Sequence, residues 1–386
     1  MVQRAFRYRF YPTPEQADAL NRTFGCVRLV YNKALDVRTS AWHADHQRVT
    51  YRQTSALLTA WKQSEELAFL NEVSSVPLQQ ALRHLQGAFV AFWGGRTRYP
   101  RFKSKKRRQD AAEYTRSAFR FQNEQLTLAK LGRPLDIRWS RPLPKASRPS
   151  TVTVSRDPAG RWFVSLRVED STISPLSPAE AQVGVDAGLT SLVTLSTGEK
   201  IANPRHEFRD RTRLAKAQRA LSRRQEGSNN RAKARLRVAC IHARITDRRR
   251  DHLHKLTTRL VRENQAIMIE DLNVRGMTGN HSLAKAIGDA GWSELRRMLE
   301  YKCSWYGREL VAVDRWLPSS KICSMCGNVA DWLPLSVRAW RCQRCGAWHD
   351  RDVNAAKNVL AAGRAVTACG AGVRPRWEFS RKGDGR

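Results

Sequence analysis

Cys323-Ser-Met-Cys326 and Cys342-Gln-Arg-Cys345 are two CxxC pairs separated by fifteen residues, and Asp352 follows seven residues after the last cysteine. Paired CxxC motifs at this spacing predict a zinc ribbon, in which the thiolates of four cysteines bind one Zn²⁺. Residues 349–356 (HDRDVNAA) then begin a helix with acidic side chains, which indicates part of a nuclease centre. We therefore expect a metal-bound knuckle beside a candidate catalytic carboxylate.

The composition of the chain points to a polyanionic partner. Its 386 residues include 69 Lys+Arg and 35 Asp+Glu, so the formal net charge is +34 and the pI is about 10.9. A charge of this size favours nucleic acid, with a membrane surface as the competing partner. However, no run of about 18 apolar residues occurs, and neither end carries a lipidation signal. The length allows two or three domains.

The N-terminus and the use of cysteine indicate a cytoplasmic protein. Residues 2–11 (VQRAFRYRFY) alternate and lack the apolar core of a signal peptide, so they predict a strand. In a reducing cytoplasm, paired cysteines bind metal rather than oxidise. The other four cysteines have no partner at ligand spacing and are expected to be packing residues: Cys26, Cys240, Cys303 and Cys369.

Two apolar strands in the C-terminal half end on a carboxylate. They are residues 182–186 (QVGVD), ending at Asp186, and residues 266–270 (AIMIE), ending at Glu270. Taken singly, each acid has a structural explanation: a turn for Asp186, a strand end for Glu270 and a helix N-cap for Asp352. A carboxylate in a buried strand is costly, however, unless a cation or hydrogen-bond donors satisfy it. Three acids in this order, with a zinc knuckle before the last, form a specific pattern.

The chemistry of phosphodiester hydrolysis explains why three carboxylates are needed. Two divalent ions about 3.5–4 Å apart stabilise charge on the attacking and leaving oxygens, and Mg²⁺ prefers carboxylate oxygens and water as ligands. We expect Asp186 to bridge two Mg²⁺ ions, while Glu270 and Asp352 each complete one site. Asp352 is preferred over Asp350 because it directly precedes the Asn-Ala-Ala segment. The neighbouring alternatives are Asp271, His349 and Asp350.

Two basic segments are candidates for nucleic-acid contact. Residues 98–108 (RYPRFKSKKRR) interleave two aromatic rings with cations, which suits phosphate contact and base stacking better than a solvated loop. Residues 205–250 contain sixteen Lys/Arg, with a turn at 226–230 (EGSNN) that predicts a helical hairpin. This run could be a solvated face, but few acids accompany it, so contact with a phosphate backbone is favoured. The candidate residues are Arg101, Lys103, Lys105, Lys106, Arg223 and Arg224.

Several motifs together resemble the transposon-encoded TnpB (OrfB) proteins, the ancestors of type V CRISPR effectors. They are residues 183–188 (VGVDAG), 269–272 (IEDL), 289–292 (DAGW), 350–356 (DRDVNAA) and the two CxxC pairs. The likeness covers nearly the whole chain, and it implies an RNA-guided DNA endonuclease with an α/β multidomain fold. The implied parts are an RNase H-like (RuvC) nuclease domain with a zinc-ribbon insert, an N-terminal wedge β-barrel and a helical recognition lobe.

The resemblance also implies domain bounds and residue roles. The bounds are 1–30 and 112–172 for the wedge, 31–111 for the recognition lobe, 180–317 and 349–369 for the nuclease domain, 318–348 for the zinc ribbon and 370–386 for a disordered tail. Asp186, Glu270 and Asp352 would be the catalytic triad that binds two Mg²⁺ ions, and the four paired cysteines would hold one structural Zn²⁺. Tyr51 and Gln79 lie in stretches similar to those that read a short transposon-adjacent motif.

The implied partners are a guide RNA made from the end of the transposon and a double-stranded target DNA, with no membrane, in a complex of one protein monomer and one RNA. Base pairing would then supply sequence specificity, so the protein need only hold backbones and read a short motif. Two alternatives are a catalytically silent RNA-guided regulator and a DNA-strand-transfer transposase. The regulator predicts a lost acidic position. The transposase predicts recognition by protein alone, but no helix-turn-helix or catalytic tyrosine is evident.

Overall fold

The structure, a computed structural model, describes residues 2–105, 110–145, 147–334 and 336–368. The chain divides into two compact units, residues 1–172 and 173–386, which are taken one at a time. The tail expected at 370–386 and the candidate Lys106 lie outside the described residues.

The first unit is built on an antiparallel sheet. Its strands are β1 (Val2–Phe10), β2 (Asp110–Thr115), β5 (Ile137–Arg138), β6 (Thr151–Arg156) and β7 (Trp162–Asp170), in the spatial order β2-β6-β7-β1-β5. Alternation in β1 buries Phe6, Tyr8 and Phe10, each at most 3% exposed, which confirms the predicted strand. A hairpin of β3 (Phe119–Gln122) and β4 (Gln125–Leu128) contributes to the same core. The wedge barrel itself stays a prediction.

Helices complete the first unit. They are α1 (Pro14–Asp45), α2 (Tyr51–Gln63) and α3 (Ser75–Trp93), with short 3-10 turns at Glu65–Asn71 and Arg116–Ala118. Both α1 and α2 begin at a capping box, because the Thr13 and Thr50 hydroxyls accept the backbone N–H three residues on. α1 continues without a break past residue 30, so the expected wedge boundary falls inside one helix.

The second unit has a mixed five-stranded sheet. Its strands are β8 (Gln182–Ala187), β9 (Ser191–Leu195), β10 (Lys200–Ala202), β11 (Ala266–Glu270) and β12 (Glu309–Val313), in the order β10-β9-β8-β11-β12. β9 runs antiparallel to both β8 and β10, whereas β11 runs parallel to both β8 and β12. Parallel strands need long connections, and helices supply them.

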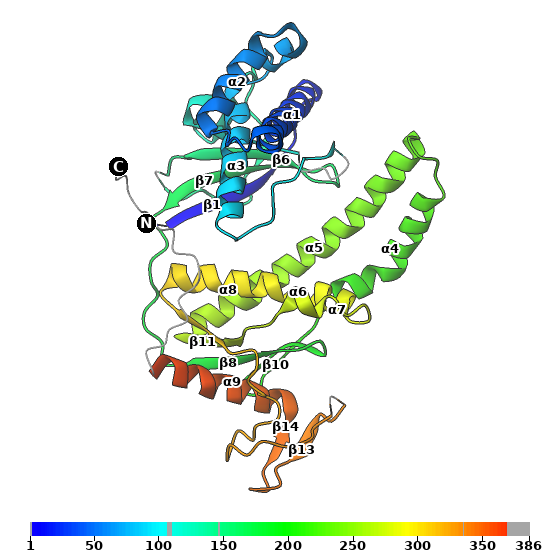
Figure 1. The fold of residues 1–386 in the computed structure, drawn as a ribbon. Helices are drawn as coiled ribbons and strands as arrows, with labels where there is room; N and C mark the ends of the chain where they lie inside the picture. Colours follow the sequence, from blue (N-terminus) through cyan, green and yellow to red (C-terminus); the bar gives the residue numbers. More distant parts are fainter. Residues whose placement is uncertain (1, 106–109, 146, 335, 369–386) are drawn as a thin grey trace. The chain divides into compact units, whose positions relative to one another are not determined.

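Helices cover both faces of this sheet, as Figure 1 shows. The described helices of the second unit are α4 (His206–Ser222), α5 (Asn229–Glu263), α6 (Val274–Met277), α7 (Ala284–Ala290), α8 (Trp292–Tyr306) and α9 (Arg351–Ala368). Alternation along β11 decides which side chains meet which helices. Ile267 and Ile269 pack with α5 and α8, whereas Ala266 and Met268 pack with α9. Both faces are therefore apolar and buried.

α4 and α5 form the predicted hairpin, with the connection at residues 223–228. Leu214 and Ala217 of α4 pack against Ile241 and Ile245 of α5, and most of the basic side chains remain exposed. The zinc-ribbon segment adds a two-stranded sheet of β13 (Ala339–Arg341) and β14 (Trp348–Asp350), which leads directly into α9. Within the described ranges, the helices are too short or too polar to span a bilayer.

Candidate active site and metal centre

Strand register brings Asp186 and Glu270 to one edge of the sheet. β8 and β11 are parallel with Val185 opposite Ile269, so the two acids are the next residues of neighbouring strands. Val185 and Ile269 both face α5 and α8. Because successive side chains of a strand point to opposite faces, both carboxylates lie on the face covered by α9.

Two glycines allow α9 to approach this face closely. A Cβ at Gly184 would lie 2.1 Å from the carbonyl oxygen of Ala356, and a Cβ at Gly363 would lie 2.1 Å from Cγ of Met268. No side chain fits at such distances, so glycine is required at both positions. The first turn of α9, which carries Asp352, is thereby held at the edge where the two strands end.

Asp186 lies close enough to Glu270 and Asp352 for their negative charges to act on it. Burial, together with the negative charges of Glu270 and Asp352, raises the pKa of Asp186 to about 8. The positive charge of Arg351 acts in the opposite direction but does not cancel the shift. A divalent cation among these oxygens would remove the repulsion, and carboxylates are the ligands that such hard cations prefer. The donor set therefore fits Mg²⁺.

Two of the acids have a further polar partner that the sequence did not indicate. Ser319 Oγ donates a hydrogen bond to Glu270 Oε1 at 2.7 Å, and Arg338 Nη1 lies 3.6 Å from Asp352 Oδ1. Both partners lie in irregular segments around the zinc ribbon. They could not be found from periodicity, because only the folded ribbon brings them to the acids.

Asp350, the closest competitor of Asp352, has a different environment. Its carboxylate accepts hydrogen bonds from Lys200 Nζ at 2.6 Å and from the backbone N–H of Val353 at 3.1 Å. It therefore pairs with a cation and caps the first turn of α9. Asp352, rather than Asp350, contributes to the raised pKa of Asp186.

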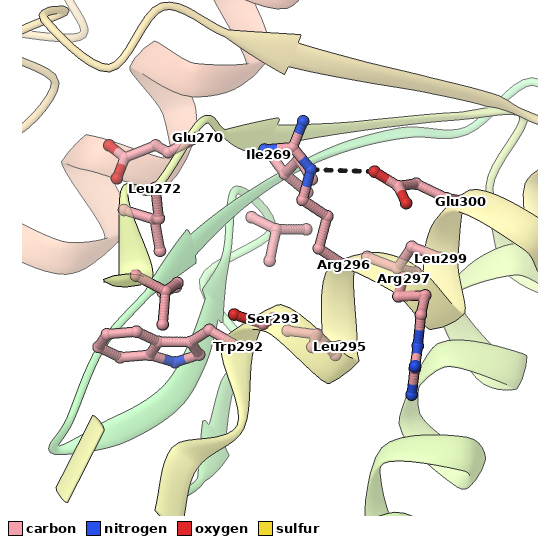
Figure 2. A pocket seen from close by; sticks show the side chains of 13 residues that line it. Ile269, Glu270, Leu272, Trp292, Ser293, Leu295, Arg296, Arg297, Leu299 and Glu300 are labelled. Atoms are coloured by element: carbon pink, nitrogen blue, oxygen red, sulfur yellow. Dashed lines mark hydrogen bonds and ion pairs between the residues drawn. The ribbon is translucent and has the colours of Figure 1, made fainter. Parts of the chain in front are cut away.

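A small cavity of about 160 Å³ borders Glu270 between β11 and α8. Figure 2 shows that apolar side chains, including that of Trp292, form much of its wall, with the carboxylate of Glu270 at the margin. Arg296, also in the wall, pairs with Asp271, and Arg315 pairs with the same carboxylate. These arginines hold the pKa of Asp271 below its usual range, so Asp271 is already balanced by protein cations.

The four paired cysteines form a second cluster, with the geometry of a zinc site. Their Sγ atoms lie within 4.8 Å of one another, with Cys323 to Cys345 at 3.6 Å and Cys326 to Cys342 at 3.7 Å. Tetrahedral Zn²⁺ with Zn–S bonds of about 2.3 Å requires sulfur separations of about 3.8 Å, whereas a disulfide bond is about 2.05 Å long. The cluster fits one structural Zn²⁺.

Both CxxC pairs fold into the same tight turn. Gly327 and Gly346 follow the second cysteine of each pair, and both have φ of +74°, a region that glycine adopts without strain. Their N–H groups donate to the carbonyl oxygens of Cys323 and Cys342 at 2.9 Å. His349 Nε2 lies 3.0 Å from Cys323 Sγ. His349, which the sequence offered as an alternative to the catalytic acids, therefore lies at the cysteine cluster.

The residues predicted to contact nucleic acid are distributed over both units. Those on exposed positions are Gln79, Arg101, Lys105, Arg223 and Arg224. Tyr51 is half-buried, and its hydroxyl accepts a hydrogen bond from Arg83 Nε at 3.4 Å. Lys103 is partly buried, with Nζ 4.1 Å from the ring centroid of Tyr31. Lys103 therefore fixes the basic segment to α1, and its contact with nucleic acid remains a prediction.

The fold and the two clusters define an α/β protein with a carboxylate site and a zinc-ribbon-type domain. Family models agree with this class. One described as "Probable transposase", of the OrfB proteins of IS605, matches residues 164–281, and one described as "Cas12f1-like, TNB domain" matches residues 292–359.

The chain belongs to the TnpB (OrfB) family. A protein of Streptomyces pristinaespiralis named "Putative RNA-guided DNA endonuclease" is 68% identical over 99% of this chain and 94% of its own length. InsQ of Escherichia coli, which carries the same description, is 35% identical over 95% of this chain and 94% of its own length. A solved complex of Cas12f1 with sgRNA and target DNA has a similar fold, with TM-score 0.56 and 12% identity over 93% of this chain and 98% of that one.

A third family model matches the N-terminal segment. A family model described as a helix-turn-helix domain matches residues 1–47, where none was evident from the sequence. In the described part of this segment, from residue 2 on, the structure has strand β1 and the single continuous helix α1. The matched segment therefore folds as a strand followed by one long helix.

Proposed function

We propose that this protein is a transposon-encoded RNA-guided DNA endonuclease. The observation that carries the proposal is the cluster of three carboxylates, in which burial and the charges of Glu270 and Asp352 raise the pKa of Asp186 to about 8. Strongly perturbed acids of this kind gather at functional sites. The names of the relatives in Streptomyces and Escherichia support the same activity.

We assign the second unit the RNase H-like arrangement of a RuvC nuclease. The strand order β10-β9-β8-β11-β12 supports this assignment, because three antiparallel strands are followed by two parallel ones. The domain bounds given by the resemblance are kept as part of the proposal, with the ribbon at 318–348. The four cysteines would hold its Zn²⁺.

Asp186, Glu270 and Asp352 would together hold two Mg²⁺ ions. When bound, such ions lower the pKa of water and stabilise charge on the attacking and leaving oxygens. The fold sets the spacing of the three carboxylates. Strand register fixes Asp186 relative to Glu270, and the approach of α9 at Gly184 fixes Asp352.

The partners we propose are a guide RNA from the transposon end and double-stranded target DNA beside a short adjacent motif. The net charge of +34 supports binding to two polyanions at once. Tyr51 and Gln79 are proposed to read the adjacent motif, and the exposed arginines of the hairpin, Arg223 and Arg224, to contact phosphates. Both nucleic acids are found in the bacterial cytoplasm, where we place the protein.

The test is cleavage by the ribonucleoprotein purified with its own RNA. The RNA is sequenced, and plasmids with and without a matching target are offered with and without Mg²⁺. We expect cleavage only with a match and with Mg²⁺, and Asp186→Ala should abolish cleavage while target binding stays within a few-fold. Binding without cleavage by the unmodified protein would identify the regulator. Joining of DNA ends without guide dependence would identify the transposase.

A further inference from the structure

Aromatic and basic side chains line a cavity of about 480 Å³ in the first unit. This volume lies in the range of small-molecule pockets, about 300–1,000 Å³. Its walls come from α1, from α3, from residues 47–49 and from Tyr99. The side chains that matter most are Arg38, Trp42, Arg48, Phe92, Trp93 and Tyr99. None of them belongs to the carboxylate or cysteine clusters.

Arg38 borders this cavity, and two of its donors lack a hydrogen-bond partner. The residue is only 5% exposed, and its Nη2 donates to Gln86 Oε1 at 2.8 Å. Its Nε and Nη1, however, have no hydrogen-bond partner. These donors are shielded, with the guanidinium carbon 5.0 Å from the ring centroid of Phe89. A buried guanidinium with unsatisfied N–H groups is costly, and an occupant that supplies an acceptor would remove this cost once the side chain shifts to expose them. A purely apolar occupant would leave this cost in place.

The two indoles provide faces on which a flat group can stack. The exposed fraction is 42% for Trp42 and 53% for Trp93. The guanidinium carbon of Arg48 lies 6.0 Å from the ring centroid of Trp42 and 5.9 Å from that of Trp93, so one planar cation already contacts both rings. Such faces accept any nucleobase, because every base has a π-face.

Tyr99 makes the opposite wall rigid. Its ring stands edge-on to the ring of Phe92, with centroids 5.3 Å apart, and its hydroxyl is 3.0 Å from Thr39 Oγ1. The Tyr99 ring is thus held in place without an occupant, which lowers the entropic cost of ordering this wall on binding.

We propose that this cavity binds one unpaired nucleotide of the guide RNA. The inference rests on the proposed function, which supplies the RNA. The base stacks on the indoles of Trp42 and Trp93, Arg38 donates to an acceptor of the nucleotide, and Arg48 moves from the rings to a phosphate. RNA is favoured over the target DNA because folded RNA presents unstacked bases in loops and bulges, whereas a base in duplex DNA must first be unpaired.

Cross-linking tests the proposal on the purified ribonucleoprotein. We irradiate the complex with ultraviolet light and map the cross-linked peptides by mass spectrometry. A nucleotide of the RNA should be attached to peptides containing Trp42, Trp93 or Tyr99. Cross-links from these peptides to target DNA only, or to no nucleic acid, would overturn the proposal.

Affinity for the transcribed RNA provides the second readout. Trp93→Ala should weaken RNA binding roughly ten-fold, the usual effect of removing a base-stacking ring. Trp93→Phe keeps an aromatic ring and should retain most of the affinity for RNA. Phe69→Ala removes a ring that is 42% exposed in the same unit, outside the cavity, and should leave RNA affinity unchanged. Unchanged affinity in Trp93→Ala refutes the inference, and guide-dependent cleavage by the unmodified protein would then still support the proposed function.

Discussion

The cysteine and carboxylate clusters both gather anionic ligands, but they are built in opposite ways. The cysteines lie within residues 323–345, on two turns of the same design, with little buried apolar surface around them beyond Trp340. The carboxylates come from residues as distant as Asp186 and Asp352, and a large apolar core on both faces of the sheet holds them. Local turns form the first site, and tertiary packing forms the second.

This difference in construction predicts different roles for the Zn²⁺ and Mg²⁺ ions that we propose. Zinc supplies folding free energy where a small domain cannot bury a sufficient core, so the ribbon depends on its metal. The sheet would keep its fold without Mg²⁺, and its acids then repel one another, as the raised pKa of Asp186 indicates. The proposed Zn²⁺ would therefore serve structure, and the proposed Mg²⁺ would balance a charge cluster that the fold has already assembled.

The sharpest test of the carboxylate site compares two neighbours. Asp352→Asn should reduce target cleavage about 10³-fold or more, as loss of a catalytic group generally does, because it removes a ligand at the edge shared with Asp186. Asp350→Asn should reduce it only a few-fold, since asparagine still caps α9 and only the ion pair with Lys200 is lost. Rates on a matched plasmid measure both. Equal losses would show that Asp350 shares the metal site.

The ribbon is tested by Cys342→Ser. The variant should lose its zinc and unfold locally around residues 318–348, seen as faster proteolysis and a zinc content near zero. Cleavage should fall too, because Asn354 and Asn358 of α9 both donate to the carbonyl oxygen of Ile322 at 2.7 Å, so the ribbon helps to position the helix that carries Asp352. Cys240→Ser changes an exposed cysteine outside the cluster and should leave both readouts unchanged. Full zinc content in Cys342→Ser would contradict a four-thiolate site.

Gly184→Ala tests whether helix packing sets the spacing of the acids. Its Cβ would meet backbone atoms of α9 at 2.1 Å, so the helix must shift, lowering stability by about 1–3 kcal/mol. A shift of about 1 Å in the position of Asp352 should slow cleavage up to about 100-fold. Gly288→Ala adds the same methyl group where nothing lies within 4 Å and should be neutral. Unchanged cleavage in Gly184→Ala would mean that α9 does not fix the site.

Most residues of the two clusters could be predicted from the sequence, for reasons that differ between the clusters. The CxxC spacing is local chemistry, and the apolar runs ending at Asp186 and Glu270 carry their carboxylates to strand ends, so both were within reach of pattern reasoning. Alternation also predicted the buried face of β1. The partners Ser319 and Arg338 were not predictable, because long-range folding alone brings irregular segments to the acids.

The unused donors of Arg38 illustrate the same limit. The helical period of α1 places Arg38 on the buried stripe after Ala34 and Leu35. Which of its donors stay unpaired, however, depends on packing against α3 and Tyr99. The predicted tail and Lys106 lie outside the described residues, so they stay predictions. Pattern reasoning therefore finds ligands that share a short segment or a strand end, and it misses those assembled only by tertiary contacts.

The smallest expected effect is on the pH dependence of stability. The pKa of Asp186 is raised in the fold to about 8, above its unfolded value of about 3.9, so its favourable contribution is complete below about pH 4 and is lost as pH rises through 8. Asp186→Asn cannot ionise. Without Mg²⁺, the melting temperature of the unmodified protein should therefore fall by a few degrees more than that of the variant between pH 6 and pH 9.

Comparing the two proteins cancels the titrating groups that are distant from Asp186, including the cysteines, provided that no chelator removes the zinc. Added Mg²⁺ should restore the melting temperature of the unmodified protein at pH 9 and leave that of Asp186→Asn nearly unchanged, because bound cation stabilises only the fold that can hold it. Parallel pH profiles for the two proteins would show that the acids do not repel one another strongly. The empty carboxylate cluster would then cost the fold little free energy, and the proposed role of Mg²⁺ in balancing its charge would be refuted.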